Sequence, residues 1–367
     1  MNAVGQDRFN FPDFPWDSLT AFKQRAAAHP DGLIDLSVGS PVDPTPGIIQ
    51  DALQASSNAP FYPTCWGTPA LRDAIVAWFA RRRRVPGLQH ENVMPTVGSK
   101  ETVAGLPLWL GLAPGDTVVF PEAAYPTYDI GARLAGATPL AEDDPALWPA
   151  STRLVWVNSP SNPSGRVSSA EELRAIVQRA RELGAIVVSD ECYAELPWNG
   201  EHVSSLLDPE ISGGDLSDLL VVYSLSKQSN LAGYRAGILA GGEDLVQAVL
   251  AIRKHIGLMP PTPVQHAMTV ALGDDAHVAA QRELYRARRA TLLPALEDAG
   301  FSVDHSEAGL YLWSRSGRST EETLSFLADL GILVAPGTFY GDDEHVRIAI
   351  TASDEAIAKA AQRLRNR

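Results

Sequence analysis

The feature that most constrains the fold is an alternation, between residues 90 and 240, of short apolar runs with amphipathic helical patterns. Short apolar runs bounded by turn residues are typical of strands buried on both faces. Strands separated by helices usually pair in parallel, with helices on both faces of the sheet. We therefore expect an α/β unit with a largely parallel sheet. The expected strands cover 93–97, 117–120, 154–157, 185–188, 219–223 and 238–240.

One helix of this unit has clear end signals. Ser168 and Glu171 form an S-x-x-E pattern, which predicts a capping box at the start of the helix. Gly184 follows Leu183, and a glycine at that place commonly ends a helix in a left-handed conformation.

After about residue 275 the pattern changes to short strands and charged helices, which indicates an α+β unit. A chain of 367 residues is also longer than most domains that fold around a single hydrophobic core. We expect an N-terminal arm with part of a small domain (1–35), a large domain (36–270) and a small C-terminal domain (271–367). The elements expected in the last of these are helices at 278–296, 320–330 and 354–365 and strands at 301–303, 310–313, 332–334 and 346–350.

Charge and cysteine content restrict the class of protein. The formal net charge is −14, from 44 acidic and 30 basic residues, which argues against binding to nucleic acid or to an anionic membrane. The run Arg81–Arg84 is interpreted as the solvated end of a helix. Two cysteines form no disulfide framework, and the N-terminus lacks a signal-peptide pattern, so we expect a cytoplasmic protein. No apolar run reaches the roughly 20 residues that span a bilayer.

Lys227 is the strongest candidate for chemistry. It follows the apolar run 219–222 and the serines Ser224 and Ser226, and Arg235 lies eight residues later. A lysine amine can bind an aldehyde covalently, while hydroxyls and a guanidinium can hold a phosphate. This arrangement suits pyridoxal 5′-phosphate (PLP), an electron sink. A lysine after a strand is more commonly a solvated surface group, so the prediction depends on the positions that agree with it.

Ligands of open α/β sheets bind at the carboxyl ends of the strands, where five further residues stand. The helix that opens with Ser99 and Lys100 could seat a phosphate on its N–H groups. Asp190 ends a buried strand, needs a partner, and could bind a protonated pyridine nitrogen. Asn162, in an N-P-x-G loop, and Tyr193 could bind the phenolic oxygen of the cofactor. Many helices begin Gly-Ser, and Asp190 could instead cap a loop, so these alternatives stay open.

Two other side chains complete the candidate set. Tyr125 could stack on a pyridine ring, or it could be an ordinary core aromatic. Arg347 lies in an apolar strand, where an arginine is costly unless it is paired. It could grip a substrate carboxylate through two hydrogen bonds, or form a structural ion pair. The eight histidines show no metal-ligand spacing, so no metal site is expected, and no glycine fingerprint for a dinucleotide is present.

Taken together, these motifs resemble the class I/II aminotransferases of PLP fold type I, the aspartate aminotransferase-like family. The resemblance extends from about Leu36 to the C-terminus and is carried by matches in one order. They are Ser37-Val38-Gly39, Tyr62-Pro63, Gly98-Ser99-Lys100, Tyr125, Asn162-Pro163-Ser164-Gly165, Asp190-Glu191-Cys192-Tyr193, Ser224-Leu225-Ser226-Lys227, Gly233-Tyr234-Arg235 and Arg347.

The resemblance implies a fold and a set of roles. The large domain would contain a mostly parallel seven-stranded sheet flanked by helices, and the small domain would close over the substrate. Lys227 would hold PLP and move the proton at the substrate α-carbon, with Asp190 on the pyridine nitrogen. Asn162 and Tyr193 would contact the phenolic oxygen, and Gly39, Asn162 and Arg347 would bind the substrate carboxylate. The residues implied around the phosphate are Ser99, Lys100, Ser224, Ser226, Arg235 and, from the neighbouring subunit of a homodimer, Tyr62.

The sequence as a whole is similar to actinobacterial N-succinyldiaminopimelate aminotransferases of lysine biosynthesis. That similarity implies amino transfer between N-succinyl-L,L-diaminopimelate and 2-oxoglutarate, although no single residue proves the substrate. The alternatives are a transaminase for aspartate or another amino acid and a PLP-dependent C–S β-lyase. A regulatory PLP-binding module is disfavoured because no basic DNA-binding segment precedes the domain.

Overall fold

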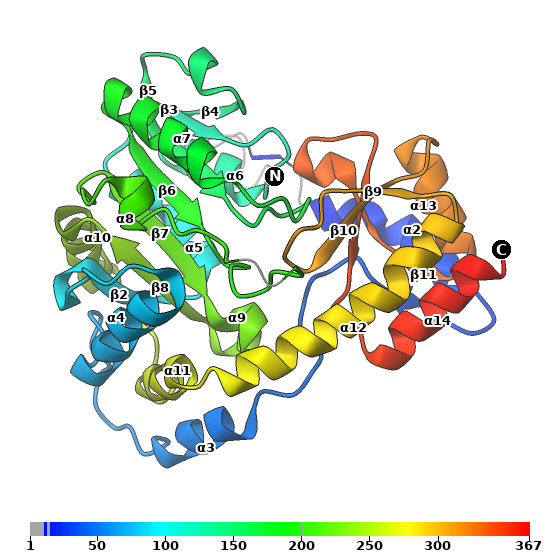
Figure 1. Ribbon diagram of the computed structural model, residues 1–367, viewed down its shortest axis with the longest axis horizontal. Helices are drawn as coiled ribbons and strands as arrows, with labels where there is room; N and C mark the ends of the chain where they lie inside the picture. The colour runs from blue at the N-terminus through cyan, green and yellow to red at the C-terminus, as the bar shows by residue number, and fades with distance from the viewer. Residues whose placement is uncertain (1–10, 13–14, 200–201) are drawn as a thin grey trace, which may run out of the picture.

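A seven-stranded sheet forms the centre of the larger part of the molecule (Figure 1). The computed structural model describes residues 11–12, 15–199 and 202–367. The strands of this sheet are β2 Val93–Val97, β3 Thr117–Phe120, β4 Thr138–Ala141, β5 Thr152–Asn158, β6 Ile186–Asp190, β7 Leu219–Ser224 and β8 Ala236–Gly241. Their order is β2-β8-β7-β6-β5-β3-β4, and only the pairs that β8 makes with β2 and β7 are antiparallel. The mostly parallel sheet that the alternating pattern predicted is therefore confirmed.

Helices cover both faces of this sheet. They are α3 Gly47–Ala55, α4 Pro69–Arg83, α5 Ser99–Trp109, α6 Thr127–Leu134, α7 Ala170–Leu183, α8 Pro209–Ser212, α9 Leu225–Gln228, α10 Glu243–Ile256 and α11 Thr262–Gly273, with the 3₁₀ turns η2 His90–Asn92, η3 Pro145–Leu147 and η4 Ala232–Tyr234. Successive strand residues point to opposite faces. In β7, Leu220 and Val222 pack with α5, α6 and α10, whereas Val221 and Tyr223 pack with α4, α7 and α11. Burial of both faces explains why the strands read as unbroken apolar runs.

The edge strand β4 had no counterpart among the expected strands. Its residues are exposed or half-buried rather than buried, and it contains Pro139. An edge strand of this kind lacks the continuous apolar signal of a central strand.

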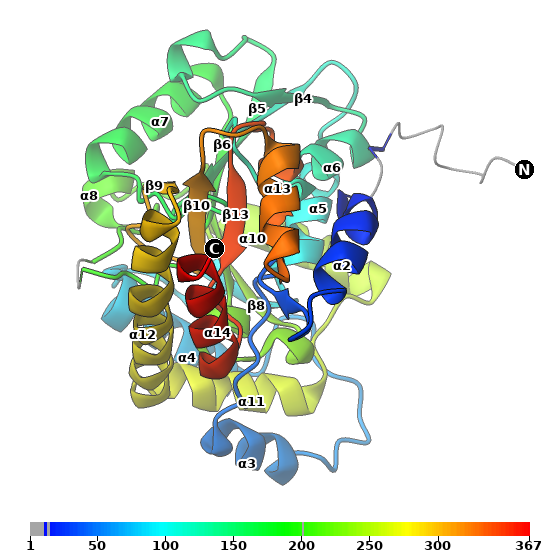
Figure 2. The same cartoon turned by 90° about the vertical axis from the view of Figure 1, so that its right-hand side faces the viewer.

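The second part of the molecule is built from both ends of the chain (Figure 2). Its elements are η1 Pro15–Leu19, α2 Thr20–Ala27, β1 Ile34–Asp35, α12 Ala276–Asp298, β9 Ser302–Asp304, β10 Tyr311–Arg315, α13 Thr320–Asp329, β11 Ile332–Leu333, β12 Ala335–Pro336, η5 Gly337–Tyr340, β13 Val346–Ala349 and α14 Asp354–Arg365. An antiparallel sheet has the order β12-β13-β10-β9, and β1 pairs in parallel with β11. Residues such as Leu36, Leu312 and Leu364 share one apolar cluster, so the N-terminal segment packs into the C-terminal unit.

The predicted capping box at Ser168 and Glu171 is wrong by one residue. Ser169 Oγ accepts from Glu172 N at 3.2 Å, and Glu172 Oε2 accepts from Ser169 N at 2.8 Å. The sequence Ser-Ser-Ala-Glu-Glu fits the S-x-x-E pattern in two registers. The first register is lost because the Ser168 N–H donates instead to Ser159 Oγ at 2.9 Å. The stop at Gly184, with φ of +66°, is as predicted.

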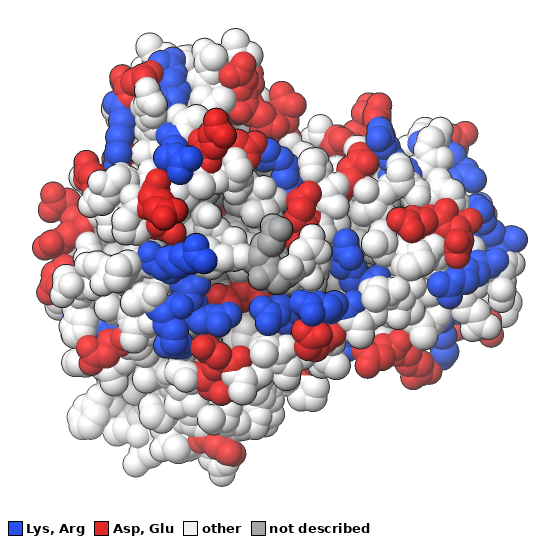
Figure 3. Space-filling view, in the orientation of Figure 1, with Lys and Arg blue, Asp and Glu red and all other residues white. Residues whose placement is uncertain are grey.

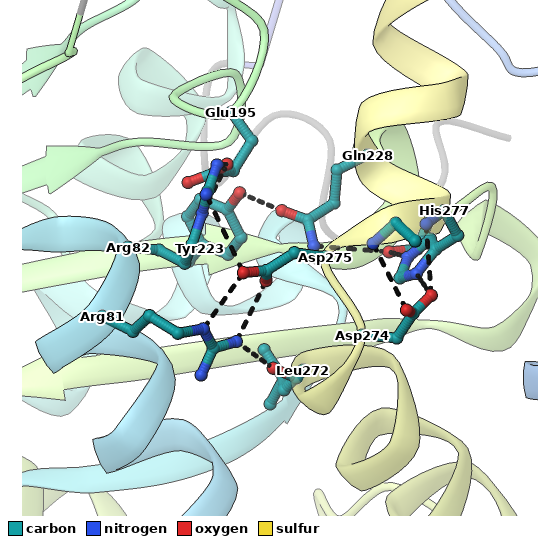
Figure 4. A network of polar contacts seen from close by, with 11 residues as sticks. Arg81, Arg82, Glu195, Tyr223, Gln228, Leu272, Asp274, Asp275 and His277 are labelled. Atoms are coloured by element: carbon teal, nitrogen blue, oxygen red, sulfur yellow. Dashed lines mark hydrogen bonds and ion pairs between the residues drawn. The ribbon is translucent and has the colours of Figure 1, made fainter.

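The interpretation of the Arg81–Arg84 run as a solvated helix end is also wrong in part. The Arg83 side chain is 1% exposed and donates to Glu191 Oε2 at 2.8 Å. Arg81 donates to Asp275 at 3.0 Å (Figure 4), so α4 is tied to the start of α12. Nearby, His277 Nε2 lies 2.8 Å from Ser229 Oγ, one residue beyond α9. Polar contacts that a charge count does not reveal thus join α12 to α4 and to the end of α9.

Crossing a bilayer needs a long apolar helix, and no helix within the described ranges meets that requirement.

Candidate active site

A cavity of about 280 Å³ lies at the carboxyl ends of the parallel strands. The side chains around it come from the loops after β2, β3, β5, β6 and β7 and from the second part of the molecule. Its lining includes every predicted site residue except Tyr62: Gly39, Ser99, Lys100, Tyr125, Asn162, Asp190, Tyr193, Ser224, Ser226, Lys227, Arg235 and Arg347. Residues separated by more than 300 positions therefore meet at one site, where open α/β sheets place their ligands.

Lys227 lies in α9, a single turn whose start is fixed by Ser224. Ser224 Oγ accepts from Ser226 N at 3.1 Å, which caps that turn. Lys227 Nζ donates to the carbonyl oxygen of Gly39. Burial lowers the pKa of the Lys227 amine, and the nearby Arg347 adds to that effect. A lowered pKa increases the fraction of neutral amine, which is the form that attacks an aldehyde.

Asp190 ends β6 and is buried, with 6% of the residue exposed. Tyr128 Oη donates to its Oδ2 at 3.1 Å and Cys192 N donates to its Oδ1 at 3.2 Å. No lysine or arginine of the described chain forms an ion pair with it, and burial raises the pKa of its carboxyl group. The adjacent Glu191, in contrast, is paired with Arg83. Asp190 is thus a buried hydrogen-bond acceptor without a cationic partner. A protonated ring nitrogen would supply that partner.

Arg347 stands at the opposite wall, in β13. Its Nη1 donates to Asn162 Oδ1 at 2.9 Å and its Nη2 donates to Ser37 O at 2.7 Å. The guanidinium lies 4.0 Å from the centre of the Tyr311 ring and 4.8 Å from that of Tyr340. Its Nε is buried without a partner in the described part of the chain, where no carboxylate pairs with Arg347 either. The alternative of a structural ion pair therefore finds no partner among these residues, and a donor remains for an incoming carboxylate.

The third part of the site is suited to an anion. Gly98, with φ of +72°, precedes the first residue of α5, and a Cβ placed there would lie 2.3 Å from Arg235 Nη2. Glycine therefore lets the Arg235 guanidinium lie against the helix N-terminus, where free N–H groups attract negative charge. Ser224 Oγ donates to Ser226 Oγ at 2.8 Å beside them. A guanidinium, hydroxyls and a helix N-terminus are the groups that hold a phosphate.

Tyr62 does not reach the cavity of its own chain. Its side chain is 99% exposed, and the neighbouring Phe61 is 86% exposed. The geometry within one chain thus leaves Tyr62 free to contact another molecule.

Six residues that line the cavity were given no role by the sequence reasoning: Trp16, Val38, Asn158, Cys192, Ala232 and Tyr311. Of these, Tyr311 was only part of an expected strand. Trp313 pairs with Arg347 across the sheet, and Tyr311 lies on the same face two residues earlier. Period-two spacing from the partner of Arg347 was the signal that could have found Tyr311.

Comparisons with known proteins agree with this geometry. The family described as aminotransferase class I and II matches residues 31–364. The 4-dedimethylamino-4-oxo-anhydrotetracycline transaminase OxyQ of Streptomyces rimosus is 54% identical over 96% of this chain and 99% of its own length. A probable aminotransferase of Mycobacterium tuberculosis is also 54% identical, over 99% of this chain and 87% of its own length. The structure of N-succinyldiaminopimelate aminotransferase from M. tuberculosis has a TM-score of 0.87 and 26% identity, with 98% of each chain covered.

Proposed function

This chain belongs to the class I and II aminotransferases, and we propose that it transfers an amino group between N-succinyl-L,L-diaminopimelate and 2-oxoglutarate. Members of the family depend on PLP and share its fold type I. When bound, PLP supplies an electron sink for the bonds of the substrate α-carbon. The single observation that carries amino transfer is that Lys227, Asp190 and Arg347 line one cavity.

The cavity fits PLP on grounds internal to the structure. Asp190 lacks a cationic partner, and Gly98 leaves room for Arg235 against α5. We propose that Asp190 holds the pyridine nitrogen protonated and that Tyr125 stacks on the ring. Asn162 and Tyr193 would bind the phenolic oxygen. The phosphate would be held by Ser99, Lys100, Ser224, Ser226 and Arg235.

The remaining roles concern the substrate. Lys227 would hold the cofactor through its amine and, once released by an amino donor, would take the proton from the substrate α-carbon and return it. Arg347 would bind the α-carboxylate through its unpartnered Nε and its nitrogens turned to Asn162 and Ser37, with the backbone of Gly39 beside it. The tyrosine rings around Arg347 exclude water, which strengthens this charge-assisted bond.

Support for the succinylated donor is the likeness to the mycobacterial N-succinyldiaminopimelate aminotransferase structure. Lys and Arg side chains gather in a band across the middle of the face shown in Figure 3, with acidic side chains around it, and the formal net charge is −14. The net charge does not favour an anionic substrate, so local cations must bind it. The cationic side chains of the cavity are Lys100, Lys227, Arg235 and Arg347. Arg347 is thus assigned to the α-carboxylate.

A second candidate substrate is a large, weakly charged oxo compound. The 54% identical OxyQ is named as a transaminase of 4-dedimethylamino-4-oxo-anhydrotetracycline. A groove of about 750 Å³ shares Tyr125 with the cavity, and its described lining combines Phe120, Phe339 and Tyr340 with the carboxylates of Glu122 and Asp129 and contains no lysine or arginine. Such a lining disfavours a dicarboxylate and leaves aromatic surface for a group without negative charge.

A panel of amino donors with 2-oxoglutarate tests the choice. The primary proposal expects the highest kcat/KM with N-succinyl-L,L-diaminopimelate, measured against aspartate and unsuccinylated L,L-diaminopimelate, and ping-pong kinetics. Pyruvate and ammonia from cystathionine would instead identify a C–S β-lyase. A preference for a polycyclic ketone as acceptor would favour the second candidate.

Lys227→Ala tests the cofactor proposal directly. We expect loss of turnover, and we expect borohydride reduction followed by peptide mapping to place the cofactor on Lys227 in the wild-type protein. Lys359→Ala is the matched control, because Lys359 is an exposed lysine that pairs with Glu355. Cofactor on another lysine, or a wild-type protein that binds no PLP, would contradict the proposal.

We further propose that the protein is a homodimer in which Tyr62 reaches the phosphate of the neighbouring subunit. A cytoplasmic location and domain boundaries after residues 35 and 270 stay predictions.

A further inference from the structure

Tyr311 occupies a position in the cavity that the roles above leave unexplained. It comes from β10 of the second part of the molecule and is buried, with 4% of the residue exposed. Its Oη lies 3.1 Å from Tyr193 Oη, and the two rings meet edge to face at 5.7 Å. The Arg347 guanidinium covers the Tyr311 ring at 4.0 Å. Tyr311 therefore contacts a proposed cofactor-binding residue and the proposed carboxylate-binding residue at once.

Gly39 makes room for the Tyr311 hydroxyl. A Cβ at Gly39 would lie 2.3 Å from Tyr311 Oη, so any larger residue would displace the phenol. The carbonyl oxygen of the same glycine accepts from Lys227 Nζ. The hydroxyl of Tyr311 is thus held beside the backbone to which the lysine is bonded.

Each of the two hydroxyls has one proton, so only one of them can donate across the 3.1 Å contact. The ionised phenolic oxygen of PLP is an acceptor only, and Tyr193 can donate to it only if its proton is not used for Tyr311. Tyr311 is then the donor of the pair and Tyr193 the acceptor. The Arg347 guanidinium against the Tyr311 ring favours this direction, because burial raises the pKa of the Tyr311 phenol whereas the nearby cation lowers it.

We propose that Tyr311 is a positioning residue that acts through Tyr193: its hydroxyl donates to Tyr193 and so directs the Tyr193 proton to the phenolic oxygen of bound PLP. Tyr311 thereby links the substrate end of the cavity to the cofactor end, because the cation that binds the carboxylate also covers its ring. This inference rests on the proposed function, since it requires PLP in the cavity.

The test is a pH titration of the visible absorption band of the PLP-loaded protein without substrate. A donor to the phenolic oxygen stabilises its anionic form, so a weaker donor makes the chromophore hold its proton more firmly. We expect Tyr311→Phe to raise the apparent pKa of the band, with a change of about threefold in the acid dissociation constant, as the loss of one oriented hydrogen bond implies. Tyr193→Phe should raise it further, and the double variant should match Tyr193→Phe alone.

Tyr340→Phe is the matched control. Tyr340 also lies against Arg347, is 2% exposed, and its hydroxyl has no partner in the described residues. Its loss should leave the titration of the band unchanged. Gly39→Ala is a second way to remove the hydrogen bond between Tyr311 and Tyr193, because the added Cβ would displace the Tyr311 hydroxyl. This variant should raise the apparent pKa of the band as Tyr311→Phe does.

The inference is overturned if Tyr311→Phe leaves the titration unchanged while Tyr193→Phe shifts it. Additive shifts in the double variant would also overturn it, because Tyr311 would then act independently of Tyr193. A wild-type protein that gains no visible band with PLP would instead refute the proposed function, and this inference with it.

Discussion

The two arginines of the cavity, Arg347 and Arg235, differ in burial and in hydrogen bonding. Arg347 is 3% exposed, donates to Asn162 and Ser37, and lies between two tyrosine rings. Arg235 is exposed, and its Nη1 donates to Ala232 O at 2.9 Å. One guanidinium is thus held in place before a ligand arrives, while the other is exposed and less constrained.

The difference indicates how each end of the site is completed. The carboxylate end is assembled within one chain, because the loop after β5, the segment before Gly39 and β10 all supply contacts to Arg347. The phosphate end is exposed in part on this chain, because Lys100 and Arg235 are exposed whereas Ser224 and Ser226 are buried. Tyr62, which is proposed to complete it, is exposed as well. We infer that substrate recognition is a property of the single chain, whereas firm cofactor retention requires the dimer.

The largest effect is expected at the buried end. Arg347→Lys keeps a charge but loses the planar fork and the ring contacts. Loss of one charge-assisted bond, about 1.5–3 kcal/mol, predicts a KM for the 2-oxo acid that is roughly 10- to 150-fold higher. PLP affinity should stay unchanged, measured by titration of the visible band. An equal loss of PLP affinity would show that the carboxylate end and the phosphate end of the cavity do not act separately.

A smaller effect is expected at the exposed end. Arg235→Gln removes the charge beside α5, and we expect a PLP dissociation constant about fivefold higher at low salt, because an exposed charge contributes only about 1 kcal/mol. The deficit should shrink at 1 M salt, where the Debye length falls to about 3 Å. The effect of Arg347→Lys should not depend on salt in this way. Salt sensitivity at both ends would show that burial does not distinguish them.

The sequence predicts which residues lie at the carboxylate end and the phosphate end of the cavity, but not which of them are buried or exposed. The order of motifs from Gly39 to Arg347 is visible in the chain, and the parallel sheet brings them together as expected. Exposure of Arg235 and burial of Arg83 could not be read from the sequence, because both depend on contacts between segments distant in the chain. The same reason hid Tyr311, whose neighbours come from three separate elements.

Register errors have a different origin. The capping box shifted by one residue because two serines precede two glutamates, so local pattern alone could not choose between them. The choice was made by Ser159, which lies outside the helix and accepts from Ser168. Patterns thus predict that an element exists more reliably than where it begins.

Tyr62 tests whether the open end is closed by a second chain. Tyr62→Phe keeps the aromatic ring and removes one hydroxyl, so we expect the dimer to persist and the PLP dissociation constant to rise about threefold, as one hydrogen bond implies. Phe61→Leu, at the adjacent exposed aromatic, is the control and should leave PLP affinity unchanged. Oligomeric state would be measured by ultracentrifugation, and a fully active monomer would exclude the shared site.

The smallest effect is expected at Asp190, whose buried carboxylate is proposed to bind the cofactor but lowers the stability of the PLP-free protein. Burial raises the pKa of its carboxyl group above the usual value, so the folded protein favours the protonated form. The contribution of Asp190 to the free energy of unfolding is therefore fully present below its pKa in the unfolded chain, about 4. That contribution is lost as pH rises through the higher pKa of the folded protein. Asp190→Asn removes the charge at all pH values and keeps acceptors for Cys192 N, so we expect the PLP-free variant to melt roughly 2 °C higher than wild type at pH 8. The gap should narrow as pH falls toward 5, measured by scanning calorimetry without cofactor. A variant that melts lower than wild type at pH 8 would mean that the ionised carboxylate stabilises the empty site, which would leave Asp190 no need of a cationic ring.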